Sequence, residues 1–171
     1  KKKNGCPTTI GLAINTRSNK DIINRQCFID ISNRLGVEVY ENKSKNKNLT
    51  QLYINCKIFA KFIADELFIS KFGKEKQFNP ALFNQDKKNL FGILEGLFLS
   101  DGSCSEARLN FDNTSKSIIN AYKILCLATG LGVNSMSFRP SRVCNRGYNN
   151  KESYKLRLNL NAKKSFKVTE R

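Results

Sequence analysis

The stretch "LEGLFLSDG", Leu94–Gly102, follows an apolar helical pattern and ends on a carboxylate, Asp101, and a glycine. A helix C-terminus carries partial negative charge, so a carboxylate there is mildly unfavourable unless a cation binds it. Carboxylate and carbonyl oxygens suit Mg²⁺, and a bound divalent ion can activate water for phosphodiester hydrolysis. The chain contains no histidine, so any hydrolysis must depend on carboxylates, lysine and metal. We therefore expect Asp101 to be a catalytic and metal-binding residue, with Ser100 beside it.

A stripe of small residues runs along the same helix. Gly92 and Gly96 lie one turn apart, and Ser100 continues their face. Each interior glycine costs roughly 0.5–1 kcal/mol relative to alanine, so two of them need a reason. Small residues let another helix approach closely, and we expect Gly92, Gly96 and Ser100 to form a helix–helix interface. If the partner helix also ends on an acid, two carboxylates meet, and a divalent cation offsets their repulsion.

The charge balance points to a polyanionic partner. Lys and Arg number 30 against 14 Asp and Glu, for a net charge of +16, and the pI is near 9.8. Such an excess concentrates a polyanion at the surface, and nucleic acid is the default candidate. A basic membrane-surface protein is the competing interpretation, although no segment approaches the roughly 20 apolar residues of a membrane span.

The six cysteines do not form a metal-binding pattern. None stands in a CxxC pair, and histidine is absent, which argues against zinc. Cys27, Cys56 and Cys126 lie in apolar runs, and we expect them to be small core residues in a reducing intracellular compartment.

The chain repeats itself at an offset of 96 positions. "IIN" occurs at Ile22–Asn24 and Ile118–Asn120, and "LGV" occurs at Leu35–Val37 and Leu131–Val133. The alternative explanation is that two unrelated segments each contain a helix that ends at a glycine. Matches in one register favour a true internal repeat.

Each half shows alternating strands around a helix. In the first, residues 10–14 and 51–55 alternate as half-buried strands, and Asp21 is expected to cap a helix that Gly36 ends. In the second, Ser117 is expected to cap a helix that Gly132 ends. Its strands are expected over residues 108–112, 136–139 and 155–160. The pattern predicts an α+β module that is used twice.

One face of each predicted strand is aliphatic and the other is polar. A twisted antiparallel sheet with an Arg, Asn and Lys face fits the major groove of DNA, where Arg suits guanine and Asn suits adenine. The alternative to a DNA-binding face is an ordinary solvent-exposed sheet face that binds no ligand. The predicted DNA-binding residues are Arg108, Asn110, Arg139, Arg142, Lys155, Arg157 and Asn159 in the second half, and Gln51, Tyr53 and Asn55 in the first.

The stretch Leu94–Gly102 resembles the LAGLIDADG motif of homing endonucleases of the dodecapeptide, intein-type class. Phe98 and Ser100 are conservative variants, and the preceding "FNPALFNQDKKNLFGI" resembles the lead-in to the second motif of intein-type members. The direct matches are Leu94, Gly96, Leu97, Asp101 and Gly102.

The resemblance implies a pseudo-symmetric pair of αββαββα-type repeats that form a saddle of antiparallel sheets. The first repeat would span residues 1–86 and the second residues 87–171. The first half opens with "KKKNG" where a motif helix is expected, so this chain is expected to lack the first motif helix. Asn4 aligns opposite Asp101 at an offset of 97 positions, one more than the offset of the repeats above. The chain is therefore expected to be a monomer if an upstream motif helix exists, and a homodimer is the other option.

The activity implied is hydrolysis of a long double-stranded DNA site with Mg²⁺ or Mn²⁺ as cofactor. Asp101 inherits the metal-binding role, and Lys74 and Lys76 are candidates for stabilising transition-state charge. Self-splicing is not expected, since it needs a histidine-bearing block. The alternative is a non-cleaving nucleic-acid binder on the same scaffold, such as an RNA maturase or a decayed endonuclease.

Overall fold

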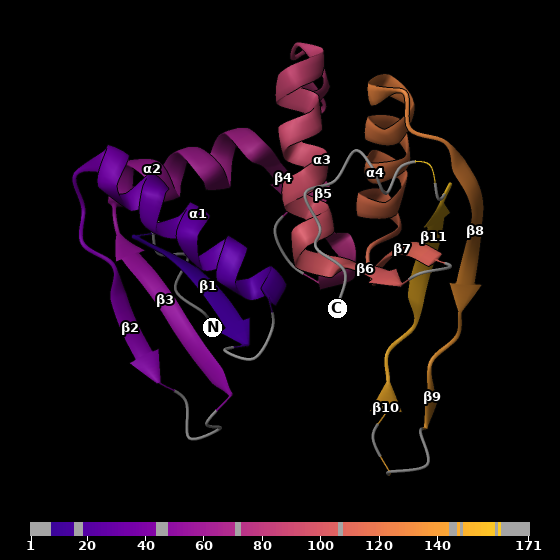
Figure 1. The fold of residues 1–171 in the computed structure, drawn as a ribbon, viewed down its shortest axis with the longest axis horizontal. Coiled ribbons are helices and arrows are strands. Elements are labelled where there is room, and N and C mark those ends of the chain that lie inside the picture. The colour runs from indigo at the N-terminus through magenta and orange to yellow at the C-terminus, as the bar shows by residue number, and fades with distance from the viewer. Residues whose placement is uncertain are drawn as a thin grey trace. The chain divides into compact units, whose positions relative to one another are not determined.

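The computed structural model describes the greater part of the chain, and its elements fall into two compact units, Lys1–Leu67 and Phe68–Arg171. Figure 1 shows the helices and strands of both units. No described helix has the length and apolar character needed to cross a membrane. The described residues are 8–15, 19–43, 48–70, 73–105, 108–143, 147, 149–159 and 161.

The first unit is a three-stranded antiparallel sheet with helices against it. Its strand order is β1-β3-β2. Leu52 and Ile54 on β3 are buried, whereas the intervening residues of that strand face away from the core. Helices α1 and α2 both contact β1. The elements are β1 (Thr9–Asn15), α1 (Asn19–Leu35), β2 (Tyr40–Lys43), β3 (Leu49–Asn55), α2 (Lys57–Phe62) and a π-helical turn η1 (Ile63–Leu67).

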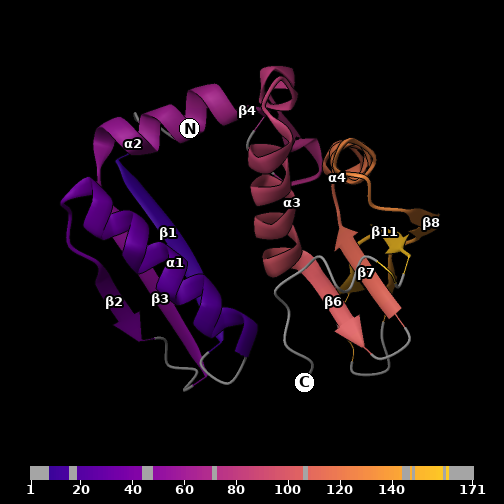
Figure 2. The same ribbon diagram turned by 45° about the horizontal axis from the view of Figure 1, so that its top comes forward.

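The second unit is a four-stranded antiparallel sheet, β6-β7-β11-β8, with α3 and α4 side by side against it (Figure 1). Figure 2 shows β6 continuing from the end of α3 and running beside β7. The elements are β4 (Phe68–Ser70), η2 (Gly73–Glu75), β5 (Gln77–Phe78), η3 (Pro80–Phe83), α3 (Lys87–Asp101), β6 (Gly102–Ser105), β7 (Arg108–Asn113), α4 (Lys116–Thr129), β8 (Val133–Arg139), β9 (Arg142–Val143), β10 (Asn149–Asn150) and β11 (Ser153–Leu158).

A stacked aromatic pair lies at the centre of the second core. The rings of Phe111 on β7 and Tyr122 on α4 have centroids 3.9 Å apart and are nearly parallel. Both side chains are fully buried, and Leu156 lies opposite Phe111 on the neighbouring strand. Burial raises the pKa of the Tyr122 hydroxyl above its ordinary value, and it raises the pKa of the Cys126 thiol to about 12. Both groups are therefore neutral parts of the core.

The two sheets share one topology, which confirms the predicted α+β module. In each unit a strand precedes a helix, and two further strands follow it. The sheet order β1-β3-β2 then corresponds to β7-β11-β8. Asn4, predicted to stand opposite Asp101, lies outside the described residues, so the predicted absence of a first motif helix stays a prediction.

The compact units do not divide where the predicted repeats divide. Strands β4 and β5 belong to the second unit, and β5 contacts α4. Phe68 and Phe78 stack with ring centroids 5.0 Å apart, and both pack with the second core. The predicted repeat boundary at residues 86 and 87 coincides with the start of α3 and remains a prediction.

Both ends of α4 are shifted by two residues from those predicted. The N-cap is Ser115, whose hydroxyl accepts a hydrogen bond from the Ile118 amide, instead of Ser117. The helix ends at Gly130, which has a φ of +85°, instead of at Gly132. Gly132 serves another purpose, because an added Cβ there would lie 3.2 Å from the Cβ of Asn159.

Two predictions for the first unit are also wrong. Asp21 lies inside α1 and does not cap it; its carboxylate accepts a hydrogen bond of 2.8 Å from the backbone of Asn15 and so ties the end of β1 to the helix. Cys27 is exposed, Cys56 is partly buried, and only Cys126 of the predicted core cysteines is buried. Gly36, with a φ of +65°, ends the helical segment as expected.

The junction between α3 and β6 predicts a strong effect of adding one methyl group. An ideal Cβ at Gly102 would lie 2.4 Å from both the ring and the carbonyl oxygen of Phe98. We expect Gly102→Ala to lower the free energy of unfolding by about 1–3 kcal/mol, as overpacking does. Urea denaturation measures this. Gly92→Ala is the matched control, since its Cβ would meet no described atom within 4 Å, and equal effects of the two changes would contradict the packing argument.

Candidate nucleic-acid interface and acidic site

Helix α3 is fixed at both ends, which positions Asp101. The Asp86 carboxylate caps the first turn by accepting a hydrogen bond of 2.7 Å from the Asn89 amide. Buried residues of α3, including Leu94 and Phe98, pack into the core. The helix therefore delivers the exposed Asp101 to the point where β6 begins.

The Asp101 carboxylate is held beside the polar sheet. Its Oδ2 accepts a hydrogen bond of 2.8 Å from the side-chain amide of Asn113, at the end of β7. The Ser100 hydroxyl donates to the carbonyl of Leu97 in its own helix, at 2.8 Å. Within the described residues, no group of three or more His, Cys, Asp or Glu side chains gathers to hold a metal. The metal-binding roles expected for Asp101 and Ser100 stay predictions.

The small-residue stripe is exposed on its own unit. Gly92 and Gly96 are exposed, and an added Cβ at either would meet no described atom within 4 Å. The expected helix–helix interface of Gly92, Gly96 and Ser100 therefore stays a prediction.

Substitutions at Gly96 test that interface directly. If another helix packs on the stripe, Gly96→Leu should lower the free energy of unfolding by about 1–3 kcal/mol. Thermal melting measures the effect. Melting at several protein concentrations also shows whether the packing helix belongs to the same chain or to a second copy, because only the second case depends on concentration. The opposite pattern, in which Gly96→Ala stabilises by up to about 1 kcal/mol and Gly96→Leu is tolerated, would show an unpacked helix surface.

The two lysine candidates have contacts of their own. Lys74 Nζ lies 2.7 Å from Glu152 Oε1, and both residues line a cleft of about 410 Å³ beside β9 and β10. Lys76 Nζ lies 5.4 Å from the ring centroid of Phe68. The backbone carbonyl of Lys76 accepts a hydrogen bond from the Ser115 hydroxyl. Neither set of contacts includes Asp101, and the catalytic roles of Lys74 and Lys76 remain predictions.

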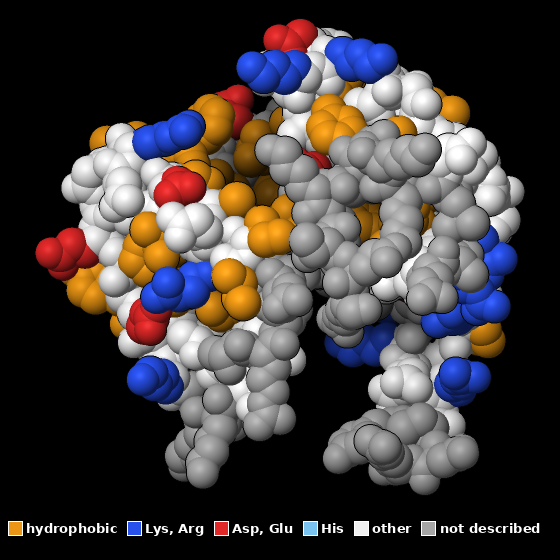
Figure 3. All heavy atoms as spheres, viewed as in Figure 1, with side chains coloured by type: hydrophobic (Ala, Val, Ile, Leu, Met, Phe, Trp, Pro, Cys, Tyr) orange, Lys and Arg blue, Asp and Glu red, His pale blue; other side chains and the backbone are white. Residues whose placement is uncertain are grey.

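The predicted polar residues of the second sheet do lie on one face. Strands β7 and β11 pair so that Asn110 stands opposite Arg157, and Phe111 opposite Leu156. Leu109, Phe111, Leu156 and Leu158 are buried on the inner face, so Arg108, Asn110, Lys155 and Arg157 must share the outer face. Register places Ser135, Ser137 and Arg139 of β8 beside them. In Figure 3, Lys and Arg side chains gather over β8 and β9.

The remaining predicted DNA-binding residues lie outside the four-stranded sheet of the second unit or on the central strand of the first sheet. Arg142 is exposed on β9, and Asn159 follows β11. On β3, Gln51, Tyr53 and Asn55 lie on the side opposite buried Leu52 and Ile54. The Tyr53 ring stacks on that of Tyr40 with centroids 5.6 Å apart. The three predicted residues of the first unit therefore lie on the outer side of its sheet.

Asp112 is the member of the outer face that sequence reasoning did not single out. Its Oδ2 lies 3.5 Å from Lys155 Nζ, and its Oδ1 lies 3.9 Å from Arg139 Nη1. The alternation of "RLNFDN" already places it on the same side as Arg108 and Asn110. What the sequence does not show is the cross-strand register that surrounds it with two cations.

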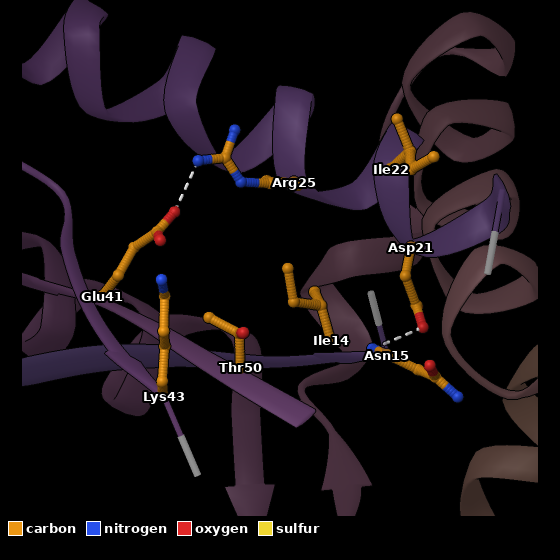
Figure 4. Close-up of a pocket in the computed structure, with 8 residues that line it drawn as sticks. All are labelled: Ile14, Asn15, Asp21, Ile22, Arg25, Glu41, Lys43 and Thr50. Atoms are coloured by element: carbon orange, nitrogen blue, oxygen red, sulfur yellow. Dashed lines mark hydrogen bonds and ion pairs between the residues drawn. The ribbon is translucent and has the colours of Figure 1, made fainter. Parts of the chain in front are cut away.

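A separate cavity lies within the first unit, between α1 and its sheet (Figure 4). It has a volume of about 220 Å³, with Ile14 and Thr50 on its floor and an Arg25–Glu41 ion pair at its rim. Ile14 pairs with Thr50 as Phe111 pairs with Leu156 in the second unit. In the second unit the corresponding pair carries the larger Phe111, which stacks on Tyr122.

Comparison with known proteins identifies the architecture. Residues 88–168 match the LAGLIDADG-like domain. Mesophilic variants of the homing endonuclease I-DmoI align over 97% of this chain and 81% of theirs, with 12% identity and a TM-score of 0.63. I-DmoI in complex with DNA and Mn aligns over 96% of this chain and 81% of its own, with 14% identity and a TM-score of 0.60.

A third structure, I-DmoI in complex with DNA and Ca, aligns over 96% of this chain and 75% of its own, with 12% identity and a TM-score of 0.58. At these identities the likeness establishes the fold. No curated protein sequence matches the chain. Residues 88–168 are thus similar to the LAGLIDADG-like domain, and the chain has the α+β fold of the homing endonuclease I-DmoI.

Proposed function

We propose that this chain is a site-specific DNA endonuclease of the homing type, from an intein or intron context, that cuts a long double-stranded target. The observation that carries the proposal is the link between Asp101 and β7. The carboxylate accepts a hydrogen bond from Asn113, and the same strand carries Arg108 and Asn110 on the outer sheet face. A polyanion bound on that face would therefore lie close to an exposed acid.

Charge supports duplex DNA as the ligand of this face. Arg108, Arg139 and Arg157 are exposed, and the whole chain carries a net charge of +16. Arg side chains bind phosphates and guanine edges, while Asn110 offers an amide of the kind that reads adenine. The relatives solved with DNA are consistent with this ligand.

The proposed cofactor is Mg²⁺ or Mn²⁺, for which Asp101 would be one ligand. I-DmoI has been solved with DNA and Mn, and in the presence of Mg. A bound divalent ion supplies an activated water and charge stabilisation for phosphodiester hydrolysis. No group of three or more His, Cys, Asp or Glu side chains gathers among the described residues, and Asp101, with Ser100 beside it, is the part of the site that we assign.

The same observation favours a second candidate, a nucleic-acid binder that does not cleave, such as an RNA maturase or a decayed endonuclease. Asn4 aligns with Asp101, and an amide is a weaker metal ligand than a carboxylate. Binding would then persist without hydrolysis.

Binding to duplex DNA should depend steeply on salt, because each neutralised phosphate releases counterions. Charge reversal at Arg139, Lys155 or Arg157 should weaken binding to a mixed-sequence duplex by about tenfold or more at low salt. The same reversal at Lys61 or Lys87, which lie on helices, is the control. Fluorescence anisotropy at several salt concentrations measures both effects. Equal losses at face and control positions would contradict the proposed interface.

Cleavage should depend on Asp101, whereas folding should not. Asp101 is exposed, and Asp101→Asn keeps an oxygen that can accept from Asn113. We expect DNA affinity within about twofold of the parent and loss of cutting of at least one strand. A plasmid carrying the site, selected first by binding, is incubated with Mg²⁺ or Mn²⁺ and run on a gel. Relaxed circles from the parent protein indicate nicking, and unchanged cutting by Asp101→Asn would overturn the role of Asp101.

A further inference from the structure

The outer face of the second sheet contains a carboxylate where a purely phosphate-binding surface would have none. Asp112 lies on β7 directly opposite Lys155 of β11, and β8 is the next strand along the sheet. It therefore lies on an inner strand of the sheet, close to the end of β7 that follows Phe111. A carboxylate in that place repels DNA phosphates, so its presence needs a reason.

The two cations around Asp112 are held loosely. Arg139 Nη1 lies 3.9 Å from Oδ1, and Lys155 Nζ lies 3.5 Å from Oδ2. These distances permit charge attraction but no good hydrogen bond. The Arg139 side chain is 54% exposed, whereas that of Lys155 is 18% exposed. Arg139 is thus able to turn toward a phosphate while Lys155 stays beside the carboxylate.

Strand β7 also carries hydrogen-bond acceptors with unused capacity. The Oδ1 atoms of Asn110 and Asp112 are both buried and have no hydrogen-bond partner among the described residues. The Asn110 residue is 8% exposed. The two positions are separated by two along the strand and share its outer side. They form a short line of acceptors within a surface that otherwise presents mainly donors.

We propose that Asp112 is a specificity-determining residue of the DNA-binding face, which accepts a hydrogen bond from the amino group of a cytosine. This inference rests on the proposed function and adds to it a base preference. When DNA binds, Arg139 moves to a phosphate and Oδ1 of Asp112 becomes accessible. A cytosine N4 amino group satisfies it, because a carboxylate accepts from that group in the major groove.

The replacement of Arg139 by a base amino group also lowers the affinity for DNA sequences that lack cytosine at this position. A base without an amino group at this position leaves the Asp112 carboxylate desolvated and short of a partner. Phosphates placed there by a non-specific complex are repelled by the negative charge. Asp112 therefore lowers affinity for wrong sites more than it raises affinity for the right one, which is how discrimination is commonly achieved.

Two substitutions separate the charge from the acceptor. Asp112→Asn removes the charge and keeps an amide of the same size, and Asn suits adenine. Asp112→Ala removes both features. The duplexes bound by the parent protein and each variant are selected from a randomised pool and sequenced, and affinity for a mixed-sequence duplex is measured at two salt concentrations.

We expect the parent to select cytosine at one position, Asp112→Asn to shift that position to adenine, and Asp112→Ala to select no base there. Affinity of both variants for the mixed duplex should rise about tenfold at low salt. The slope of log K against log salt should steepen by about 0.9, as for one further phosphate contact. Glu66→Gln, the same charge change on the exposed η1 turn, is the control.

The outcomes distinguish this inference from the proposed function. If the parent binds DNA but all three proteins select the same bases, or if Glu66→Gln raises affinity as much as Asp112→Asn, the role of Asp112 is refuted while DNA binding stands. If the parent binds no duplex, both are refuted. Asp112→Asn preserves side-chain size, so it decides the question should Asp112→Ala fail to fold.

Discussion

The separation of an apolar face from a charged face in β7 and β11 is the constraint on which the second unit depends. Because side chains alternate strictly along a strand, a slip of one residue would move Leu156 to solvent and Arg157 into the core. In the observed register Leu156 lies opposite Phe111, and Phe111 stacks on Tyr122 of α4 on the inner side. Core packing and the composition of the candidate DNA-binding face are therefore decided by the same register.

The position of Asp101 depends on the same core. Phe98 anchors the last turn of α3, and Gly102 is required beside it because no Cβ fits there. The chain can then turn directly into β6, which pairs with β7. An apolar helix that ends on an acid and a glycine thus places a carboxylate at the edge of a polar sheet. The same residues of the motif thus pack the end of α3 and position the candidate acid.

Sequence patterns predicted the features that depend on local periodicity. Alternation identified the outer residues of β3, β7 and β11, and the internal repeat predicted two sheets of one topology. The ends of α4 were misplaced because serines stand at both 115 and 117, and glycines at both 130 and 132. The structure distinguishes them: the Ser115 hydroxyl also donates to the carbonyl of Lys76, and Gly130 has the positive φ that ends the helix, whereas Gly132 lies close to Asn159.

Features that depend on pairing between distant strands could not be predicted in this way. The grouping of Asp112 with Arg139 and Lys155 requires the register of three strands that are separated in the sequence. The exposure of Cys27 likewise depends on how α1 packs, because an apolar run alone does not state which side of a helix is covered.

The central claim is that duplex DNA lies on the outer face of the second sheet, and arginine footprinting tests it most directly. The chain is treated with an arginine-specific dicarbonyl reagent, with and without duplex DNA, and the modified sites are quantified by mass spectrometry. The account predicts strong protection of Arg108, Arg139 and Arg157 and unchanged reactivity of Arg34, on the last turn of α1. Protection of Arg34 without protection of the three sheet arginines would contradict it.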